Sequence, residues 1–515
     1  MTQPANVLFI TADQWRADCL SRLGHPCLKT PNLDRLAARG TLFKAHYTQA
    51  TPCGPGRASL YTGLYLHNHR CVVNGTPLDA RHSNVALEAR KAGYDPVMLG
   101  YTDATPDPRE HHPGDPLLRS YEGVLPGMTP LVNLDGQQLA WIAHLRALGY
   151  DVPIDGDEVF LPKPDFPGAA ERGSTYAPTV YKAEHSNSAF LTDEALKYIS
   201  VRGELPWFVH ISYLAPHPPF IVPEPYHELY DPADVPPLLR AESPEAEGRQ
   251  HPWLGWYLFN QRGTPPTIGL NPRDNIKLSE AHLRQVRATY YAMMTEIDHH
   301  LGRILDSLEA QGQLDSTLIV FTTDHGEQLG DHWLFAKYGY YEQSFHIPLI
   351  VSDPRPAAEA GRGVLVEAFT ENVDVMPTIL DWLGLEHPAQ CDGRSLLPFC
   401  HGTPPAAWRE ETHWEFDFRD RLDDLRAAGF ELGPEDCALS VLRGPRYKYV
   451  HFAAMPPLLF DLQEDPGEFH DLAGDPKHRE VVLTCAQKML SWRMGSEEKV
   501  LTGQKITPQG IKVIA

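Results

Sequence analysis

Five short apolar segments alternate with helical patterns along this chain, and this alternation constrains the fold more than any other feature. The segments cover residues 6–11, 94–101, 207–213, 316–321 and 347–351. Nearly continuous apolar runs of this length are typical of strands buried on both faces of a parallel sheet. Strands that alternate with helices predict an α/β fold, in which a mainly parallel sheet is covered by helices on both faces.

The predicted helices carry clear start and stop signals. Thr30 and Pro31 open a helix that Gly40 closes. Residues 279–311 keep apolar side chains at a spacing of three to four, the clearest helical pattern in the chain. Further helices are predicted at residues 188–200, 374–384 and 477–494.

The 515 residues are enough for one large domain and a smaller addition. We expect a catalytic domain over residues 1–395, with long insertions at about 104–185 and 221–278. The first insertion is rich in Pro, Gly and charge, which predicts little regular structure. Two short strand-like runs, 438–442 and 447–452, then predict a C-terminal subdomain over 396–515 with a small antiparallel sheet.

Charge and hydropathy exclude several classes of protein. The formal net charge of −22 argues against binding to nucleic acid or to anionic membranes. No apolar run approaches membrane-spanning length, and the N-terminus lacks the basic region of a secretory signal. The eight cysteines are scattered, as expected for free thiols in a reducing compartment. We therefore expect a soluble, cytoplasmic protein.

One Pro- and Gly-rich turn, residues 51–63, combines Cys53 with Arg57. The prolines restrict the backbone on either side of the cysteine, and the glycines permit close approach of other groups. A cysteine beside a helix start lies where backbone N–H groups favour negative charge. The turn itself leaves two interpretations open, a buried structural cysteine and a sulfur-derived nucleophile.

Polar residues follow several of the predicted strands. Asp13 and Gln14 follow the first, His217 follows the third, and Asp324 and His325 follow the fourth. The carboxyl ends of parallel strands meet at one edge of a sheet, where α/β proteins place their ligands. Two aspartates and a histidine there predict a site for a divalent metal.

Cationic side chains are expected around this metal site. Arg57, His217 and Lys337 would surround a bound oxyanion. A metal ion flanked by cations is the arrangement that transfer of a phosphoryl or sulfuryl group requires, because catalysis then depends on positioning and charge stabilisation. Taken singly, each of these residues also has an ordinary structural interpretation, so their joint placement is the evidence.

These motifs resemble those of the type I sulfatases in the alkaline phosphatase superfamily. The chain is similar over nearly its whole length to bacterial phosphonate monoester hydrolases and the related arylsulfatases. The resemblance implies an alkaline-phosphatase-like fold. The matching runs are Cys53-Gly54-Pro55-Gly56-Arg57, Asp13-Gln14-Trp15-Arg16, His217-Pro218-Pro219-Phe220 and Asp324-His325-Gly326-Glu327.

The resemblance implies a modified nucleophile. A formylglycine-generating enzyme would oxidise Cys53 to formylglycine (3-oxoalanine), whose hydrate is a gem-diol. One hydroxyl would attack sulfur or phosphorus and expel the alcohol. The other, after losing its proton, would collapse the covalent hemiacetal ester by C–O cleavage and regenerate the aldehyde.

The same resemblance implies roles for the remaining site residues. Arg57 would position the gem-diol, while His217 and Lys337 would contact the transferred group and assist the leaving oxygen. The substrate site would also include Asn74, Tyr101 and Gln14. The metal ligands would be Asp13, Asp324, His325 and the modified Cys53.

Two positions depart from the pattern of many sulfatases. Tyr101 and Asp103 stand where a lysine and a histidine commonly face the anion, and an acid there would repel a sulfate unless it is protonated, paired or turned away. Gln14 replaces a second aspartate, which leaves fewer negative ligands. The site therefore suits Mn²⁺ as well as Ca²⁺.

The leading hypothesis is a hydrolase of small, singly charged sulfate, phosphonate or phosphodiester esters. Two alternatives remain: a phosphatase or phosphodiesterase of the same superfamily that uses an unmodified thiol, and a catalytically inactive binding protein. The long insertions and the resemblance predict a homo-oligomer, a homotetramer or a homodimer.

Overall fold

The structure of the chain is a computed structural model that describes residues 6–156, 158–266 and 270–514. An eight-stranded sheet forms its centre, in the order β10-β2-β9-β8-β1-β7-β5-β6. The five strands from β8 to β6 are parallel, and β9 is antiparallel to both of its neighbours. The predicted mainly parallel sheet is confirmed. Its strands are β1 (Asn6–Ala12), β2 (Thr41–Phe43), β5 (Pro96–Gly100), β6 (Thr129–Asn133), β7 (Phe208–Tyr213), β8 (Thr317–Thr322), β9 (Leu349–Ser352) and β10 (Leu365–Val366).

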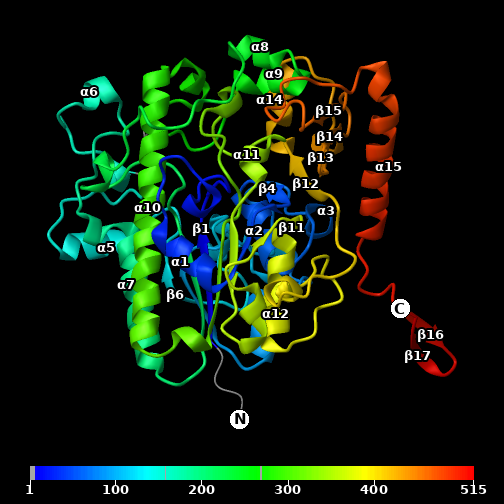
Figure 1. The fold of residues 1–515 in the computed structure, drawn as a ribbon, viewed down its shortest axis with the longest axis horizontal. Coiled ribbons are helices and arrows are strands. Elements are labelled where there is room, and N and C mark those ends of the chain that lie inside the picture. Colours follow the sequence, from blue (N-terminus) through cyan, green and yellow to red (C-terminus); the bar gives the residue numbers. More distant parts are fainter. Residues whose placement is uncertain (1–5, 157, 267–269, 515) are drawn as a thin grey trace.

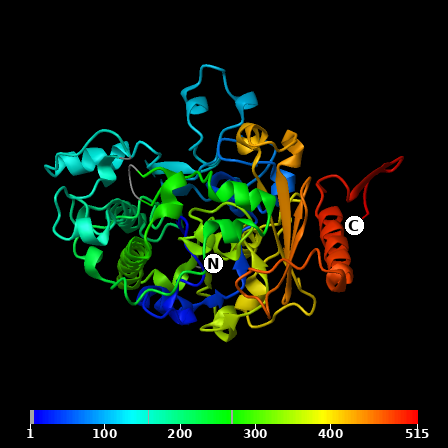
Figure 2. The same cartoon turned by 90° about the horizontal axis from the view of Figure 1, so that it is seen from above.

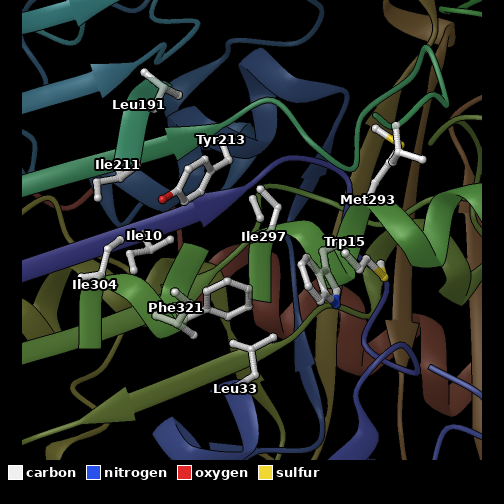
Figure 3. Packing of buried hydrophobic residues seen from close by; sticks show 14 of the residues in the cluster. Ile10, Trp15, Leu33, Leu191, Ile211, Tyr213, Met293, Ile297, Ile304 and Phe321 are labelled. Atoms are coloured by element: carbon white, nitrogen blue, oxygen red, sulfur yellow. The ribbon is translucent and has the colours of Figure 1, made fainter. Parts of the chain in front are cut away.

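Helices cover both faces of the sheet, as predicted. The four helices α1 (Pro31–Arg39), α5 (Leu139–Ala147), α7 (Asn187–Arg202) and α10 (Glu280–Ala310) share one core with Leu8 and Ile10 of β1. The other face of the same strand packs Val7 and Phe9 against α2 (Cys53–Thr62), α4 (Val85–Lys91) and α12 (Val375–Leu383). Figure 3 shows the first core, in which side chains of α10 meet those of the central strands.

The longest helix, α10, matches the clearest helical pattern of the sequence. Ser279 caps its first turn by accepting a hydrogen bond from the His282 N–H, and the helix ends at Ala310. Figure 1 shows it running beside α7 along one side of the molecule. The other predicted helices are also present as α1, α7, α12 and α15 (Arg479–Gly495).

Besides the single turn of α6 (Ala169–Arg172), strand β6 and helix α5 lie inside the stretch 104–185, where the sequence analysis expected little regular structure, and that expectation is wrong for both. Strand β6 extends the main sheet at its edge, and α5 packs Trp141 and Ile142 into the first core. Only Val132 of β6 is buried, and Pro130 interrupts the run. An edge strand with one buried residue lacks the alternation by which strands are recognised.

A second sheet packs against the side of the body. Its order is β15-β14-β13-β12-β4, and α15 covers its outer face (Figure 2). The predicted antiparallel pair is confirmed as β13 and β14, whereas β4 comes from the N-terminal part of the chain and pairs in parallel with β12. The boundary near residue 395 remains a prediction. The strands are β4 (Ala50–Thr51), β12 (Thr412–Asp417), β13 (Ala438–Arg443), β14 (Tyr447–Phe452) and β15 (Leu458–Asp461).

Short elements complete the described chain. Within its described parts, no helix combines the length and the apolar character needed to cross a lipid bilayer. The hairpin of β16 (Gln504–Thr507) and β17 (Gly510–Val513) extends away from the body beyond α15 (Figure 1). The others are β3 (His46–Tyr47), β11 (Thr370–Glu371), α3 (Leu66–His69), α6 (Ala169–Arg172), α8 (Pro244–Gly248), α9 (Pro252–Leu258), α11 (Glu342–Phe345), α13 (Leu397–Cys400) and α14 (Leu422–Ala427).

Candidate active site

The carboxyl ends of β1 and β8 bring the predicted metal ligands together. The two strands are parallel neighbours, so Asp13 and Asp324, which follow them, lie at the same edge of the sheet. One possible ligand atom from each of Asp13, Cys53, Asp324 and His325 lies within 4.8 Å of the other three. All four side chains are buried. The strand-end argument therefore correctly brought Asp13, Asp324 and His325 together, whereas their role as metal ligands remains a prediction.

Helix α2 delivers Cys53 to this cluster. The sequence placed the cysteine just before a helix, whereas in the structure Cys53 is itself the first helical residue. A Cβ atom on Gly56 would lie 2.8 Å from the Asp324 carbonyl oxygen, so only glycine permits the helix to pack this closely on the end of β8. The packing places the Cys53 sulfur 3.2 Å from Nε2 of His325.

Arg57 joins the two aspartates. Its Nε donates to Oδ2 of Asp324 and one terminal nitrogen donates to Oδ2 of Asp13, each at 3.0 Å. The other terminal nitrogen donates to the Tyr101 carbonyl oxygen at 3.0 Å and to Oγ of Ser212 at 2.9 Å. The guanidinium also lies 4.2 Å from the centre of the Tyr101 ring. Nε and both terminal nitrogens of the buried Arg57 therefore donate hydrogen bonds. These bonds hold the first turns of α2 against the strand ends.

Asp13 has one carboxylate oxygen without a partner. Its Oδ2 accepts hydrogen bonds from Arg57 and from the Tyr101 hydroxyl, but no described residue donates to Oδ1. Burial alone would raise the pKa of Asp13, yet the charges of Arg57 and Lys337 help to hold it well below its usual range. A buried, ionised oxygen without a donor is costly unless a cation binds it. The donor set of this cluster therefore fits a divalent cation.

Lys337 supplies a second buried cation. Its Nζ donates to Oε1 of Gln14 at 2.7 Å, the one hydrogen bond recorded for this ammonium group within the described chain. Burial would lower the pKa of Lys337, but the negative charge of Asp13 contributes to raising it above its ordinary value. Lys337 therefore keeps its positive charge and has N–H bonds free to meet an anion.

The two remaining predicted residues lie at the margin of the cluster. Oδ1 of Asn74 accepts a 2.9 Å hydrogen bond from the Gly54 N–H and so anchors the first turn of α2. His217 follows β7 and is half-buried, with Nδ1 2.7 Å from the Pro218 carbonyl oxygen. Burial lowers the pKa of His217 to about 3, so the ring is neutral at physiological pH. No hydrogen bond within the described chain joins His217 to the other predicted site residues.

Asp103 lies inside the cluster. Its Oδ2 is 3.8 Å from Nε of Arg57, and its buried Oδ1 has no partner among the described residues. Burial raises the pKa of Asp103 to about 7, although Arg57 opposes the shift. The residue has a φ of +48°, which is uncommon for a side-chain-bearing residue. The acid that the sequence analysis singled out is therefore buried, and its one recorded ion pair within the described chain is the 3.8 Å contact with Arg57.

Two further residues of the site had no role assigned from the sequence. Ser212 near the end of β7 accepts from Arg57, and Glu327 accepts from Nε2 of Gln14. Signals for both were present, because Ser212 is the second-last residue of a predicted strand and Glu327 follows His325 by two residues. What the sequence does not specify is which side chains these two residues meet.

The assembled site combines a buried cluster that could hold a cation, a buried cysteine at a helix N-terminus and an ammonium group with N–H bonds to spare. Such a site can polarise an anionic ester, hold its attacking group and stabilise the charge that develops during group transfer. These are the capacities predicted from the sequence.

Comparisons with known proteins cover nearly the whole chain. The sulfatase family model matches residues 5–385, and a model for the C-terminal part of N-sulphoglucosamine sulphohydrolase matches residues 330–495. The multifunctional alkaline phosphatase superfamily protein PehA of Trinickia caryophylli is 45% identical, with 98% of each chain covered. The phosphonate monoester hydrolase of Agrobacterium radiobacter superposes with a TM-score of 0.92 at 42% identity, with 99% of each chain covered. The phosphonate monoester hydrolase SpPMH of Silicibacter pomeroyi also has a TM-score of 0.92, at 39% identity and 99% coverage of each chain.

Proposed function

The chain belongs to the sulfatase family, and from this membership we propose that it hydrolyses sulfate monoesters and phosphonate monoesters, with phosphodiesters as further substrates. The observation that carries the proposal is the buried cluster of Asp13, Cys53, Asp324 and His325, clamped by Arg57. Sulfate monoesters, phosphonate monoesters and phosphodiesters all present a tetrahedral centre with a single negative charge. One site can therefore accept all three.

A divalent cation, Mn²⁺ or Ca²⁺, would be held by Asp13, Asp324, His325 and the modified Cys53. The unpartnered Oδ1 of Asp13 and the spacing of the four ligand atoms support this assignment. When bound, the cation supplies Lewis-acid polarisation of the ester and offsets its charge. The hydrogen bonds of Arg57 hold both aspartate side chains in place before the cation arrives.

Conversion of Cys53 to formylglycine, by a formylglycine-generating enzyme, fits its position in the cluster. The aldehyde hydrate supplies two hydroxyl groups, one that attacks the ester centre and one whose loss of a proton releases the acid anion. A hydroxyl on residue 53 would also lie beside the metal ligands, because the Cys53 sulfur is already 3.2 Å from the ring of His325. Over one cycle, one water is consumed and the ester gives an alcohol and the acid.

The remaining residues bind and orient the ester. Lys337 points a charged ammonium group at the cluster and would stabilise the transferred group and the leaving oxygen. His217, which follows β7, would contact the same oxygen and would donate to it once its Nε2 carries a proton. Asn74 fixes the first turn of α2 through Gly54. Tyr101 and Gln14 complete the substrate site.

The oligomeric state and location belong to the same proposal. We propose a homotetramer or homodimer in the cytoplasm. The hairpin of β16 and β17 supports self-association, because it extends from the body with Ile506, Ile511 and Val513 each at least 69% exposed. A two-stranded hairpin is marginal alone and gains stability from a covering surface. None of the eight cysteines forms a disulfide in the structure, which a reducing compartment permits.

The test is a comparison of kcat/KM for an aryl sulfate and an aryl ester of phenylphosphonate. The enzyme is produced with a formylglycine-generating partner and supplied with Mn²⁺ or Ca²⁺. We expect both esters to be cleaved, and a ratio above about tenfold, equivalent to about 1.4 kcal/mol in the transition state, identifies the main activity. If metal-loaded, modified enzyme cleaves neither ester, the proposal is overturned.

A further inference from the structure

Three buried side chains form a continuous chain of hydrogen bonds beside the metal cluster. Lys337 Nζ donates to Oε1 of Gln14 at 2.7 Å, and Nε2 of Gln14 donates to Oε2 of Glu327. Gln14 and Glu327 are fully buried, and Lys337 is 5% exposed. The mechanism described above uses Lys337 but gives Glu327 no role.

The partners of Gln14 leave its amide one orientation. An ammonium group offers only donors and a carboxylate only acceptors, so the amide oxygen must face Lys337 and the amide nitrogen must face Glu327. The backbone of Gln14 is fixed as well, because its N–H donates to Asp324 at 3.3 Å and its carbonyl oxygen accepts from the Tyr290 hydroxyl at 2.6 Å. The polarity of the amide therefore depends on the acceptor at position 327.

Glu327 also closes the loop that leads to Lys337. Its Oε1 accepts from the Leu329 N–H at 2.8 Å and from the Ala336 N–H at 2.7 Å. Both backbone donors meet the same oxygen, which leaves Oε2 to Gln14. The two oxygens thus have separate functions, one in closing the loop and one in orienting the amide.

We propose that Glu327 is a positioning residue that fixes the Gln14 amide and thereby holds Lys337 toward the reacting centre. This inference rests on the proposed function, since it gives Lys337 the leaving oxygen as its target. Without a carboxylate at position 327, the Gln14 amide is free to turn its nitrogen toward Lys337. The ammonium group then loses its acceptor and moves away from the cluster.

Because the two oxygens of Glu327 have separate functions, one substitution can change the contact with Gln14 and leave the loop contacts in place. In Glu327→Gln the side-chain oxygen can still accept from Leu329 and Ala336, so the loop remains closed. The new amide nitrogen faces Nε2 of Gln14, and relief of this donor–donor contact turns the Gln14 amide over. Adding Gln14→Glu restores a matching chain, because the amide introduced at position 327 then donates to the carboxylate introduced at position 14. The other oxygen of that carboxylate accepts from Lys337.

Two readouts test the relay. The first is kcat/KM over a series of aryl esters whose phenols differ in acidity. Displacement of Lys337 should lower kcat/KM most for esters of the least acidic phenols, because their leaving oxygens need the most stabilisation. The second is binding of inorganic sulfate by calorimetry, which requires no turnover. For Glu327→Gln we expect kcat/KM to fall about tenfold or more for the poorest leaving group, with weaker sulfate binding. The double variant should recover the wild-type dependence on leaving group, because Lys337 regains its acceptor. Lys337→Ala serves as the reference, because it removes the contribution of the ammonium group to both readouts.

Glu247→Gln is the matched control. Glu247 is also buried and also accepts a backbone N–H, from Ala241, but its other oxygen accepts from His332. This variant should keep the wild-type dependence on leaving group. If Glu327→Gln alone does not fold, Gln14→Glu is the single variant, and adding Glu327→Gln to it should improve sulfate binding.

An unchanged leaving-group dependence and unchanged sulfate affinity in folded Glu327→Gln would overturn the relay, as would a folded double variant without recovery. A wild-type enzyme that cleaves no ester in the series would instead count against the proposed function. The sulfate-binding arm then still decides whether Glu327 positions Lys337.

Discussion

Two of the buried charge clusters in the described chain differ in how completely their oxygens are partnered. In the candidate active site, Oδ1 of Asp13 and Oδ1 of Asp103 are buried without any donor among the described residues. In a second cluster, formed by Glu371, Asp374 and Arg409, all four carboxylate oxygens accept hydrogen bonds. Both clusters contain an arginine between two carboxylates.

The difference separates a site built for a ligand from one built for the fold. A fully partnered cluster gains nothing from a further cation, and it holds together the segments that contribute to it. A cluster with unpartnered oxygens carries a desolvation cost that a bound cation would offset. Each prediction below tests one side of this comparison.

The largest effect is expected at Cys53. Cys53→Ala removes the nucleophile precursor, so kcat should fall by about 10⁴-fold or more, as it does when nucleophiles are removed from other hydrolases. The free energy of unfolding should change little, because the small side chain makes few contacts that hold the fold. Steady-state kinetics and urea denaturation measure the two quantities. Activity close to that of the wild type would show that the nucleophile lies elsewhere.

The fully partnered cluster should respond in the opposite way. Arg409→Met leaves Asp374 and Glu371 buried without their cation, which should lower the free energy of unfolding by about 3–5 kcal/mol. The activity of the folded fraction should remain within about twofold of wild type, since Arg409 has no part in the site. The control is Arg39→Met, whose exposed pair with Asp315 should be worth less than about 1 kcal/mol. If Arg409→Met and Arg39→Met lowered the free energy of unfolding equally, the buried cluster would not stabilise the fold as proposed.

Metal binding should stabilise only the cluster with unpartnered oxygens. At a free cation concentration of about 100 times Kd, the folded protein should gain about 2.7 kcal/mol, visible as a rise in Tm. Asp324→Asn should abolish most of this gain, and a chelator should remove both the gain and the activity. An equal rise in Tm for Asp324→Asn would place the cation at another site.

The smallest effect concerns pH and His46, whose ring lies between Thr370 and Asn372 beside the fully partnered cluster. Burial lowers the pKa of His46 from 6.5 to about 4. Because the unfolded chain takes up this proton first, the stability that the neutral ring contributes is complete above pH 6.5 and is lost as the pH falls toward 4. Between about pH 6.5 and 5.5 the loss should be about 1 kcal/mol.

Denaturant unfolding of wild type and His46→Gln at the two pH values isolates this contribution. The variant should lose less stability than wild type over the same interval, since glutamine does not titrate. Identical pH slopes would show that His46 is not held neutral in the fold.

Much of the fold and of the metal cluster could be predicted from the sequence. Strands β1, β5, β7 and β8 are continuous apolar runs, and parallel strands place their carboxyl ends together whatever their order in the sheet. Asp13, Asp324 and His325 could therefore be assigned to one site before their distances were known. Arg57 and Cys53 followed because their shared turn matches a specific motif.

The contacts between distant segments could not be predicted in the same way. Strand β4 has two residues, too few for any periodic pattern, yet it joins the small sheet through Glu415 and Phe416. The orientation of Gln14 depends on Glu327, 313 residues away. A pattern in the sequence reports burial and periodicity, whereas these features depend on which side chains meet after folding.

The most direct test of the account is the chemical state of residue 53 in active enzyme. Trypsin releases it in the peptide Ala45–Arg57, which contains no other cysteine. Mass spectrometry should find an aldehyde in which one oxygen replaces the sulfur, the thiol hydrogen and one hydrogen of the β-carbon. The modified fraction should rise in proportion to kcat across preparations. An intact Cys53 thiol in fully active enzyme would contradict the account.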